Sequence, residues 1–259
     1  MLKNKKIFIL MAAVVIPFFV LPVSAEQATP AGDSANKALA LLKASDRARG
    51  SVQGGIQWEA TVTSEENDEK SERTFIVKAQ GDNAHVESIA PAKYKGEVYI
   101  FNDRNMWFYK PSLKKPVSIS ARQKLSGQAA NGDIASTNYA RDYTPEVEKI
   151  EKINGENVYV LLLKGKSKNL TYDKIRYWIN EKTKLAIKAE FLTLQGVPFK
   201  RGEMTYGEKI KIDGETIPFV SELSIVDAKF PKNKSTIKYR SAQLKSVPSS
   251  LFNVNNLTR

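Results

Sequence analysis

The chain has 259 residues, a formal net charge of +12 and one histidine, and it contains no cysteine. The absence of cysteine excludes disulfide bonds, thiolate metal sites and anchoring through a lipidated N-terminal cysteine. A chain of this length can bury a core that is large enough to fold without such cross-links.

The first 25 residues have the layout of a secretory signal peptide. Lys3, Lys5 and Lys6 precede an apolar run over residues 7–23, and small residues follow up to Ala25. A retained membrane anchor is the alternative, but the run is short for a membrane span and is interrupted by proline. We therefore expect export and cleavage after Ala25, which leaves a mature chain with a charge of +9.

The basic charge of an exported chain favours anionic lipid head groups or acidic proteins as partners over nucleic acid. Simple solubility explains the charge equally well.

One helix is predicted near the N-terminus, after a flexible lead-in over residues 26–33. Asp33 or Ser34 can cap a helix over residues 34–49, and Gly50 stands where such a helix would stop. Apolar residues recur every three or four positions, which is typical of one buried helix face: Ala35, Ala38, Leu39 and Leu42.

From residue 51 onward the apolar pattern alternates, which predicts β-strands. The strand-like runs cover residues 56–63, 75–77, the surroundings of His85, 97–101, 106–109, 116–120, 147–153, 158–164, 172–180, 185–194, 200–212, 217–227 and 235–244. Short turns join most of them, so the sequence predicts a mainly β (α+β) protein. We expect one domain over residues 34–259, with an antiparallel sheet of about 11 strands.

Some of these strands are apolar on both faces. Val98 and Ile100 alternate with Tyr99 and Phe101, and the run Met106–Tyr109 is wholly apolar or aromatic. A single helix cannot cover so much apolar surface. A sheet that curls into a half-open barrel, with the helix packed against its concave face, would turn the remainder into a cavity for an apolar ligand.

Aromatic residues of the strands are the candidates for the wall of this cavity. Trp107 and Tyr109 are the first choice, followed by Trp58, Phe75, Phe101 and Phe191, with ordinary core packing as the alternative role. The polar residues 122–143 are predicted to form either a mobile gate at the cavity mouth or a second helix. The gate candidates are Gly127, Gly132, Asp133, Asn138, Tyr139 and Asp142.

No motif for catalysis, for a metal or for a cofactor stands out. His85 lies in a strand-like run without a second histidine or a nucleophile motif, and we expect it to be a partly exposed strand residue. We therefore predict a protein that is not an enzyme and needs no cofactor. A hydrolase with carboxylates paired in space is the alternative.

Several stretches of the sequence resemble one protein family. "MWFYKPSLKKPVSIS" at 106 and "LSGQAANGDIASTNYARDY" at 125 are similar to the signature region of the LolA-like family of bacterial outer-membrane lipoprotein-sorting proteins. Weaker similarities follow in the expected order, at "ERTFIVKAQ" (72), "DKIRYWINEKTKLAIKAEF" (173), "KRGEMTYGE" (200) and "VPSSLFN" (247). Together they extend over nearly the whole mature chain.

This resemblance implies a half-open β-barrel capped by helices, acting in the periplasm. It implies a carrier of lipoprotein acyl chains or of another lipid, sorted towards the outer membrane, with only transient membrane contact. An RND-type membrane transporter is the partner that the resemblance suggests. The alternative is an envelope sensor that detects lipids or lipoproteins and contacts a membrane protein, because a shared fold does not fix a function.

Overall fold

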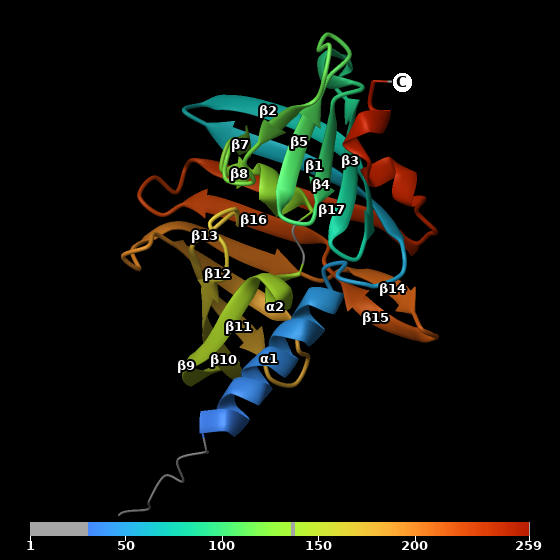
Figure 1. The fold of residues 1–259 in the computed structure, drawn as a ribbon. Helices are drawn as coiled ribbons and strands as arrows, with labels where there is room; N and C mark the ends of the chain where they lie inside the picture. Colours follow the sequence, from blue (N-terminus) through green and yellow to red (C-terminus); the bar gives the residue numbers. More distant parts are fainter. Residues whose placement is uncertain (1–30, 136–137, 259) are drawn as a thin grey trace, which may run out of the picture.

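The computed structural model describes residues 31–135 and 138–258, and its main element is one antiparallel sheet of 13 strands (Figure 1). The predicted signal peptide lies outside the described residues. In their spatial order the strands are β6 (Val117–Ile119), β5 (Asn105–Tyr109), β4 (Val98–Asn102), β3 (Asn83–Ala90), β2 (Glu69–Gln80), β1 (Ile56–Glu66), β17 (Lys234–Leu244), β16 (Glu222–Asp227), β13 (Pro198–Thr205), β12 (Ala186–Leu192), β11 (Lys174–Asn180), β10 (Glu156–Gly165) and β9 (Tyr143–Ile153).

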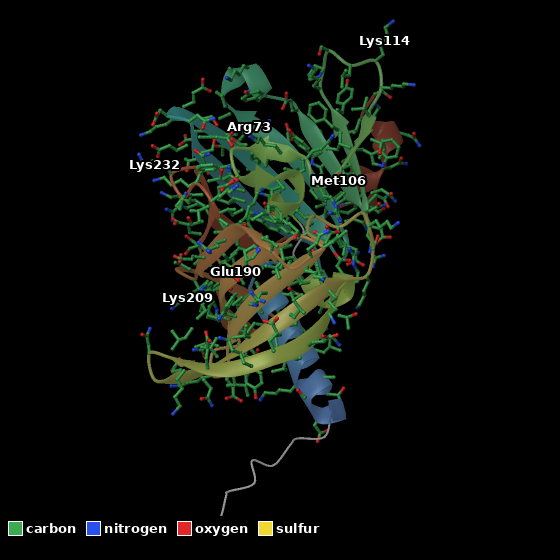
Figure 2. The ribbon with its side chains drawn as sticks, turned by 90° about the vertical axis from the view of Figure 1, so that its left-hand side faces the viewer. Arg73, Met106, Lys114, Glu190, Lys209 and Lys232 are labelled. Atoms are coloured by element: carbon green, nitrogen blue, oxygen red, sulfur yellow. The ribbon has the colours of Figure 1, made fainter. Side chains whose placement is uncertain are left out.

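The sheet is open, because its two outermost strands, β6 and β9, do not pair with each other. Strands β1 to β6 form a meander, and its first strand pairs with β17, the last strand of the chain. Lys114 lies on the turn between β5 and β6, which projects from one end of the molecule (Figure 2). The mainly β fold and the open, curved sheet expected from the sequence are thus confirmed, with 13 strands instead of about 11.

Two of the predicted strands are each divided in two. The run 200–212 forms β13 and β14 (Glu208–Ile212), and the run 217–227 forms β15 (Glu215–Phe219) and β16. The division lies where Ser221 Oγ accepts a hydrogen bond from the backbone N–H of Gly207, at 2.8 Å. Both runs are interrupted at this point, so β14 and β15 pair as a separate two-stranded hairpin.

The N-terminal helix α1 (Ala31–Arg47) packs against the inner side of the sheet at β9 and β11. It already includes Asp33, so residues 31–33 are helical and not part of a flexible lead-in, and Asp33 lies in the first turn instead of capping it. Gly50 follows the helix with a φ of +104°, as expected for a helix stop. Among the described residues, no helix is both long and apolar enough to cross a membrane.

The described residues between 122 and 142 contain only short elements. These are β7 (Lys124–Ser126) and β8 (Ala129–Ala130), which pair with each other, the 3-10 helix η2 (Asn131–Ile134) and the four-residue helix α2 (Tyr139–Asp142). The other short helical turns are η1 (Ala92–Tyr94), η3 (Ser249–Phe252) and η4 (Val254–Asn256).

The two apolar faces of the strands have different partners. The inner face belongs to one large core cluster, which also includes Leu41 and Leu42 of α1. On the outer face, Val158, Val160 and Trp178 form a second cluster of their own. The C-terminal turn η3 packs against the outer side of β3 and β4, where the amide of Asn102 donates to the carbonyl of Phe252 at 3.5 Å. Much of the outward apolar surface is therefore covered by the chain itself.

Replacing Gly50 by alanine should lower the free energy of unfolding by about 1–2 kcal/mol, because a left-handed backbone disfavours a side chain. The added methyl would also lie 3.3 Å from the Trp58 ring. Gly54→Ala is the control, since nothing lies within 4 Å of its added methyl, and it should change stability by less than about 0.5 kcal/mol. Equal urea midpoints for the two variants would contradict this account of the helix end.

Candidate functional site

The inner face of the sheet is the candidate site, and four of the aromatic residues predicted for it lie there. Trp58 of β1, Phe75 of β2, Phe101 of β4 and Phe191 of β12 are buried in the same core cluster. Strand register explains why they share a face, because Trp58 pairs with Val77 and residues two positions apart on a strand point the same way. Their role in ligand binding remains a prediction.

The two residues predicted most strongly for the cavity wall lie on the opposite face. Tyr99 of the inner face pairs with Phe108, so Phe108 points inward and its neighbours Trp107 and Tyr109 point outward. Both are half-buried on the outer side, where Trp107 pairs with Ile100. The sequence could not decide between the faces, because Met106–Tyr109 is apolar at every position.

The concave side is filled by two segments of the chain, which we call the plug: residues 38–49 at the end of α1, and residues 128–134 with 138–142. Ala38, Leu42, Ile134 and Tyr139 of the plug are buried in the core cluster with the inner face of the sheet. The expected cavity is thus occupied by the chain's own side chains.

The predicted gate residues form part of the plug or border it, and most are buried. Gly132, Asp133, Tyr139 and Asp142 are buried, while Gly127 and Asn138 are partly exposed. A methyl on Gly132 would lie 1.9 Å from Thr171 Oγ1, which shows how closely this segment packs. The described residues of the predicted gate are therefore mostly buried and form no long helix. Their side chains cover the apolar inner face of the sheet.

Buried polar contacts join the two parts of the plug to each other and to the sheet. Asp46 Oδ2 of α1 accepts a hydrogen bond from the backbone N–H of Ala140, at 2.7 Å. Arg49 is 4% exposed, donates to the Tyr177 hydroxyl of β11 at 3.3 Å and lies over the Tyr139 ring at 4.5 Å from its centre. A charged hydrogen bond and a cation–π contact thus hold the end of α1 in the interior.

A second polar anchor holds residues 128–134. Asp133 Oδ2 accepts hydrogen bonds from the N–H of Ala130 at 2.8 Å and from the Tyr172 hydroxyl at 2.9 Å. Lys200 of β13 donates to the carbonyl of Gln128 at 2.6 Å. Burial raises the pKa of the Asp133 carboxyl and lowers the pKa of the Lys200 amine, because both charged forms lose contact with water.

Asp46 is a carboxyl group of the plug that is only partly satisfied. Its Oδ1 atom is buried without a hydrogen-bond partner among the described residues. Burial raises the pKa of this carboxyl to about 7, although the N–H of Ala140 and the charge of Arg49 act in the opposite direction.

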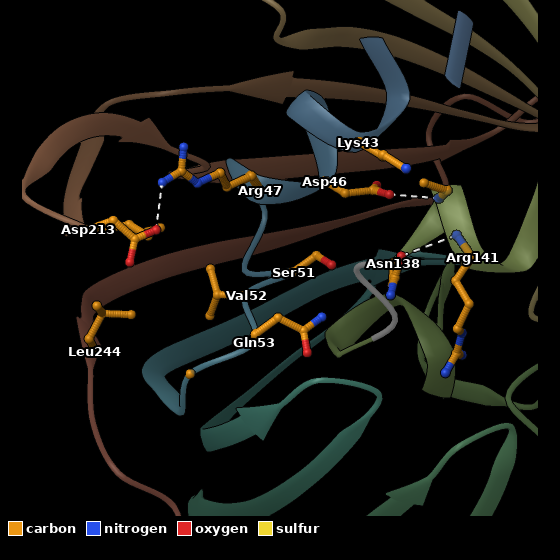
Figure 3. Close-up of a pocket in the computed structure, with 13 residues that line it drawn as sticks. Lys43, Asp46, Arg47, Ser51, Val52, Gln53, Asn138, Arg141, Asp213 and Leu244 are labelled. Atoms are coloured by element: carbon orange, nitrogen blue, oxygen red, sulfur yellow. Dashed lines mark hydrogen bonds and ion pairs between the residues drawn. The ribbon is translucent and has the colours of Figure 1, made fainter. Parts of the chain in front are cut away.

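The plug reaches the surface in a groove of about 550 Å³ beside the end of α1 (Figure 3). Lys43, Asp46 and Arg47 of α1 line one side of it, and Asn138 and Arg141 line the side of α2. Arg47 lies 3.1 Å from Asp213 and Arg141 lies 2.8 Å from Asp142, so both arginines are paired. Asn138 Oδ1 accepts from the N–H of Arg141 at 3.2 Å, which caps α2.

The chemistry of this site is that of packing and hydrogen bonding. Within the part of the chain that the structure describes, no group of three or more side chains is arranged to hold a metal ion. His85 is 7% exposed, so it is buried and not partly exposed as the sequence suggested, and burial lowers its pKa.

Sequence reasoning missed Asp46 and Arg49 as interior residues, because charged side chains are rarely buried and those at a helix end are usually exposed to water. A signal was present. Residues 38, 42, 45 and 49 follow the three-to-four spacing of one helix face, and the first two are apolar. Ser45 and Arg49 therefore continue the buried stripe, and Asp46 lies beside it.

A family model described only as "Uncharacterized protein" matches residues 80–259, well over half of the chain. Among curated proteins, none matches the sequence significantly.

Solved structures are similar over most of the chain. A LolA superfamily protein from Nitrosomonas europaea is 29% identical, with a TM-score of 0.75, over 85% of this chain and 98% of its own. A DUF1329 family protein from Desulfovibrio piger is 18% identical, with a TM-score of 0.71, over 86% and 99% of the two chains. An outer membrane lipoprotein-sorting protein domain from Vibrio parahaemolyticus is 21% identical, with a TM-score of 0.70, over 87% and 100%. The last two are evidence for the fold alone.

Asp46→Asn should change how stability depends on pH. The pKa of the Asp46 carboxyl is about 7 in the folded protein, above its ordinary value of 3.8. Between these two pH values, Asp46 is therefore protonated in the folded protein and ionised in the unfolded chain. The free energy of unfolding should therefore fall as the pH rises from about 4 to 7, by an Asp46 contribution on the order of 4 kcal/mol. Urea titrations of both proteins across this range measure it, and a stability difference that does not vary with pH would contradict the assignment.

Proposed function

This chain belongs to the LolA-like family, and from that premise we propose that it is an exported carrier that binds an acyl chain, of a lipoprotein or of another lipid, on the inner face of its sheet. The observation that carries the proposal is the apolar inner face of an open sheet, covered by the plug and not by a closing strand. The similarity to the Nitrosomonas europaea LolA superfamily protein over nearly its full length supports it.

The plug supports this proposal because it covers the inner face with short segments held partly by polar contacts. Asp46 and Arg49 attach α1, and Asp133 attaches the segment 128–134. Polar groups can exchange such contacts for water at small net cost, whereas a fully apolar core would resist opening. A cargo chain would take the place of plug side chains against the sheet.

The energies suit a carrier that must also release its load. An acyl chain of about 16 carbons gains roughly 12 kcal/mol on burial, at about 0.8 kcal/mol per methylene, before ordering costs. Displacing Leu41, Leu42 and Ile134 opposes this gain by about 1.5–3 kcal/mol each. This cost and the ordering costs together offset a large part of the gain, so binding is reversible and transfer to a stronger acceptor needs no nucleotide.

The place of action that fits this function is the periplasm, after export through the signal peptide predicted in residues 1–25. We further propose that an RND-type membrane transporter exchanges cargo with the protein, which rests on family resemblance alone. Co-purification of the tagged chain with such a transporter tests this part separately.

Adjacent residues of β5 offer a matched test of the inner face. Phe108 is only partly buried against the core cluster, 5.0 Å from the Tyr99 ring, while Trp107 is half-buried on the outer face. Phe108→Ala should weaken binding of a fluorescent fatty acid about tenfold, because one aromatic contact with the chain is lost. Trp107→Ala should change the affinity less than about twofold.

Thermal melts of both variants separate loss of binding from loss of folding. Equal weakening by the two substitutions, at equal stability, would contradict binding on the inner face. Native mass spectrometry of gently purified mature protein then identifies the cargo. A protein that carries no lipid and binds no fatty acid would overturn the carrier function.

A further inference from the structure

Four large apolar side chains are exposed at two turns and an adjoining strand start on one side of the molecule. Leu194 and Val197 belong to the turn between β12 and β13, and Phe199 lies at the start of β13, with exposures of 63%, 58% and 39%. Phe230, in the turn between β16 and β17, is 62% exposed. We call these four residues the apolar tip. Large apolar residues are usually buried, and a group of them exposed together often marks a site of contact with a protein or a membrane.

The two turns are neighbours and are held in place by hydrogen bonds. The carbonyl of Phe199 accepts a bond from the backbone N–H of Ala228 at 3.0 Å, where β13 pairs with β16. Asp227 Oδ1 accepts bonds from the N–H groups of Lys229 and Phe230, at 2.8 and 2.9 Å. Phe230 therefore lies on a turn that is fixed by hydrogen bonds.

Lysines surround the apolar tip. Lys174 donates to the carbonyl of Leu194 at 2.6 Å, and Lys229 and Lys232 are exposed on the turn that carries Phe230. Figure 2 shows Lys232 at the edge of the molecule. Neither Lys229 nor Lys232 has an ion-pair partner among residues 31–135 and 138–258.

The acidic turn between β1 and β2 lies beside the turn that carries Phe230, where the backbone N–H of Asn67 donates to Asn233 Oδ1 at 3.2 Å, and two of its four carboxylates are in ion pairs. Glu65 lies 3.4 Å from Lys234, and Glu66 lies 2.6 Å from Lys124. Asp68 and Glu69 remain exposed on that turn. The lysines next to Phe230 in the chain, Lys229 and Lys232, thus lie beside the apolar tip without a carboxylate within ion-pair distance among the described residues.

We propose that the apolar tip docks the protein on an anionic lipid bilayer. Apolar side chains on projecting turns can enter the boundary between head groups and acyl chains, while lysines beside them contact the anionic head groups. A protein interface would need a broader, complementary surface of about 800 Å² on each side. Docking goes beyond the proposed carrier function, because Leu194, Val197 and Phe230 are exposed and lie outside the core cluster of the inner face.

A label at a single site tests which surface enters the membrane. Because the chain has no cysteine, Phe230→Cys can carry one environment-sensitive fluorophore. Ile150→Cys is the matched control, since Ile150 is 52% exposed on the edge strand β9. With vesicles of phosphatidylglycerol and phosphatidylethanolamine, the label at 230 should shift to shorter wavelength and the label at 150 should not.

Vesicle sedimentation of unlabelled protein gives the strength of docking. Leu194→Ser with Phe230→Ser should reduce binding at least about tenfold, whereas Ile150→Ser should leave it unchanged. Lys229→Gln with Lys232→Gln should weaken binding to anionic vesicles, and added salt should weaken binding of the natural protein. Thermal melts verify that each variant folds.

Three results would overturn the proposal. These are no binding of the natural protein to anionic vesicles, a wavelength shift at position 150 instead of 230, and unchanged binding of the Leu194 and Phe230 double variant. Phe108→Ala should bind vesicles as the natural protein does. Docking and the carrier function can therefore fail independently.

Discussion

The structure depends on covering the concave apolar face of a sheet that does not close. A closed barrel buries its inner face by itself, but here β6 and β9 remain unpaired and the inside would meet water. The chain meets this constraint by folding the end of α1 and residues 128–134 and 138–142 into the interior, where Leu42, Ile134 and Tyr139 are buried. The buried polar contacts and the groove beside α1 both belong to this plug.

The plug combines apolar packing with buried charge. Arg49 contacts Tyr177 and Tyr139, while Asp46 bonds to Ala140 and keeps one oxygen without a partner. Buried charges stabilise a fold less than apolar groups of the same volume, but they fix one arrangement against others. This combination fits a plug that adopts one defined arrangement when it is packed against the sheet and that a ligand can displace at a small cost in free energy. In this way, the packing of the plug in the interior would allow the proposed exchange of cargo.

The sequence predicted the class of fold well and the details of the site only in part. Alternation at Trp58, Phe75 and Phe191 identified buried strand positions, and Gly50 identified the end of the helix. The face of Trp107 could not be predicted, because Met106–Tyr109 is apolar at every position and only pairing with β4 assigns a side. The plug was missed because its Gly and Asn content is typical of exposed loops, whereas long-range contacts such as Gly132 with Thr171 bury it.

Displacement of the plug by cargo is the central claim, and hydrogen exchange at the backbone amides of Ala130 and Ala140 tests it most directly. These amides donate to Asp133 and Asp46, so each reports one anchor of the plug. With a saturating long-chain fatty acid, both should exchange at least about tenfold faster than in the free protein, because the anchors open. Unchanged or slower exchange at both amides while the fatty acid is bound would contradict the account.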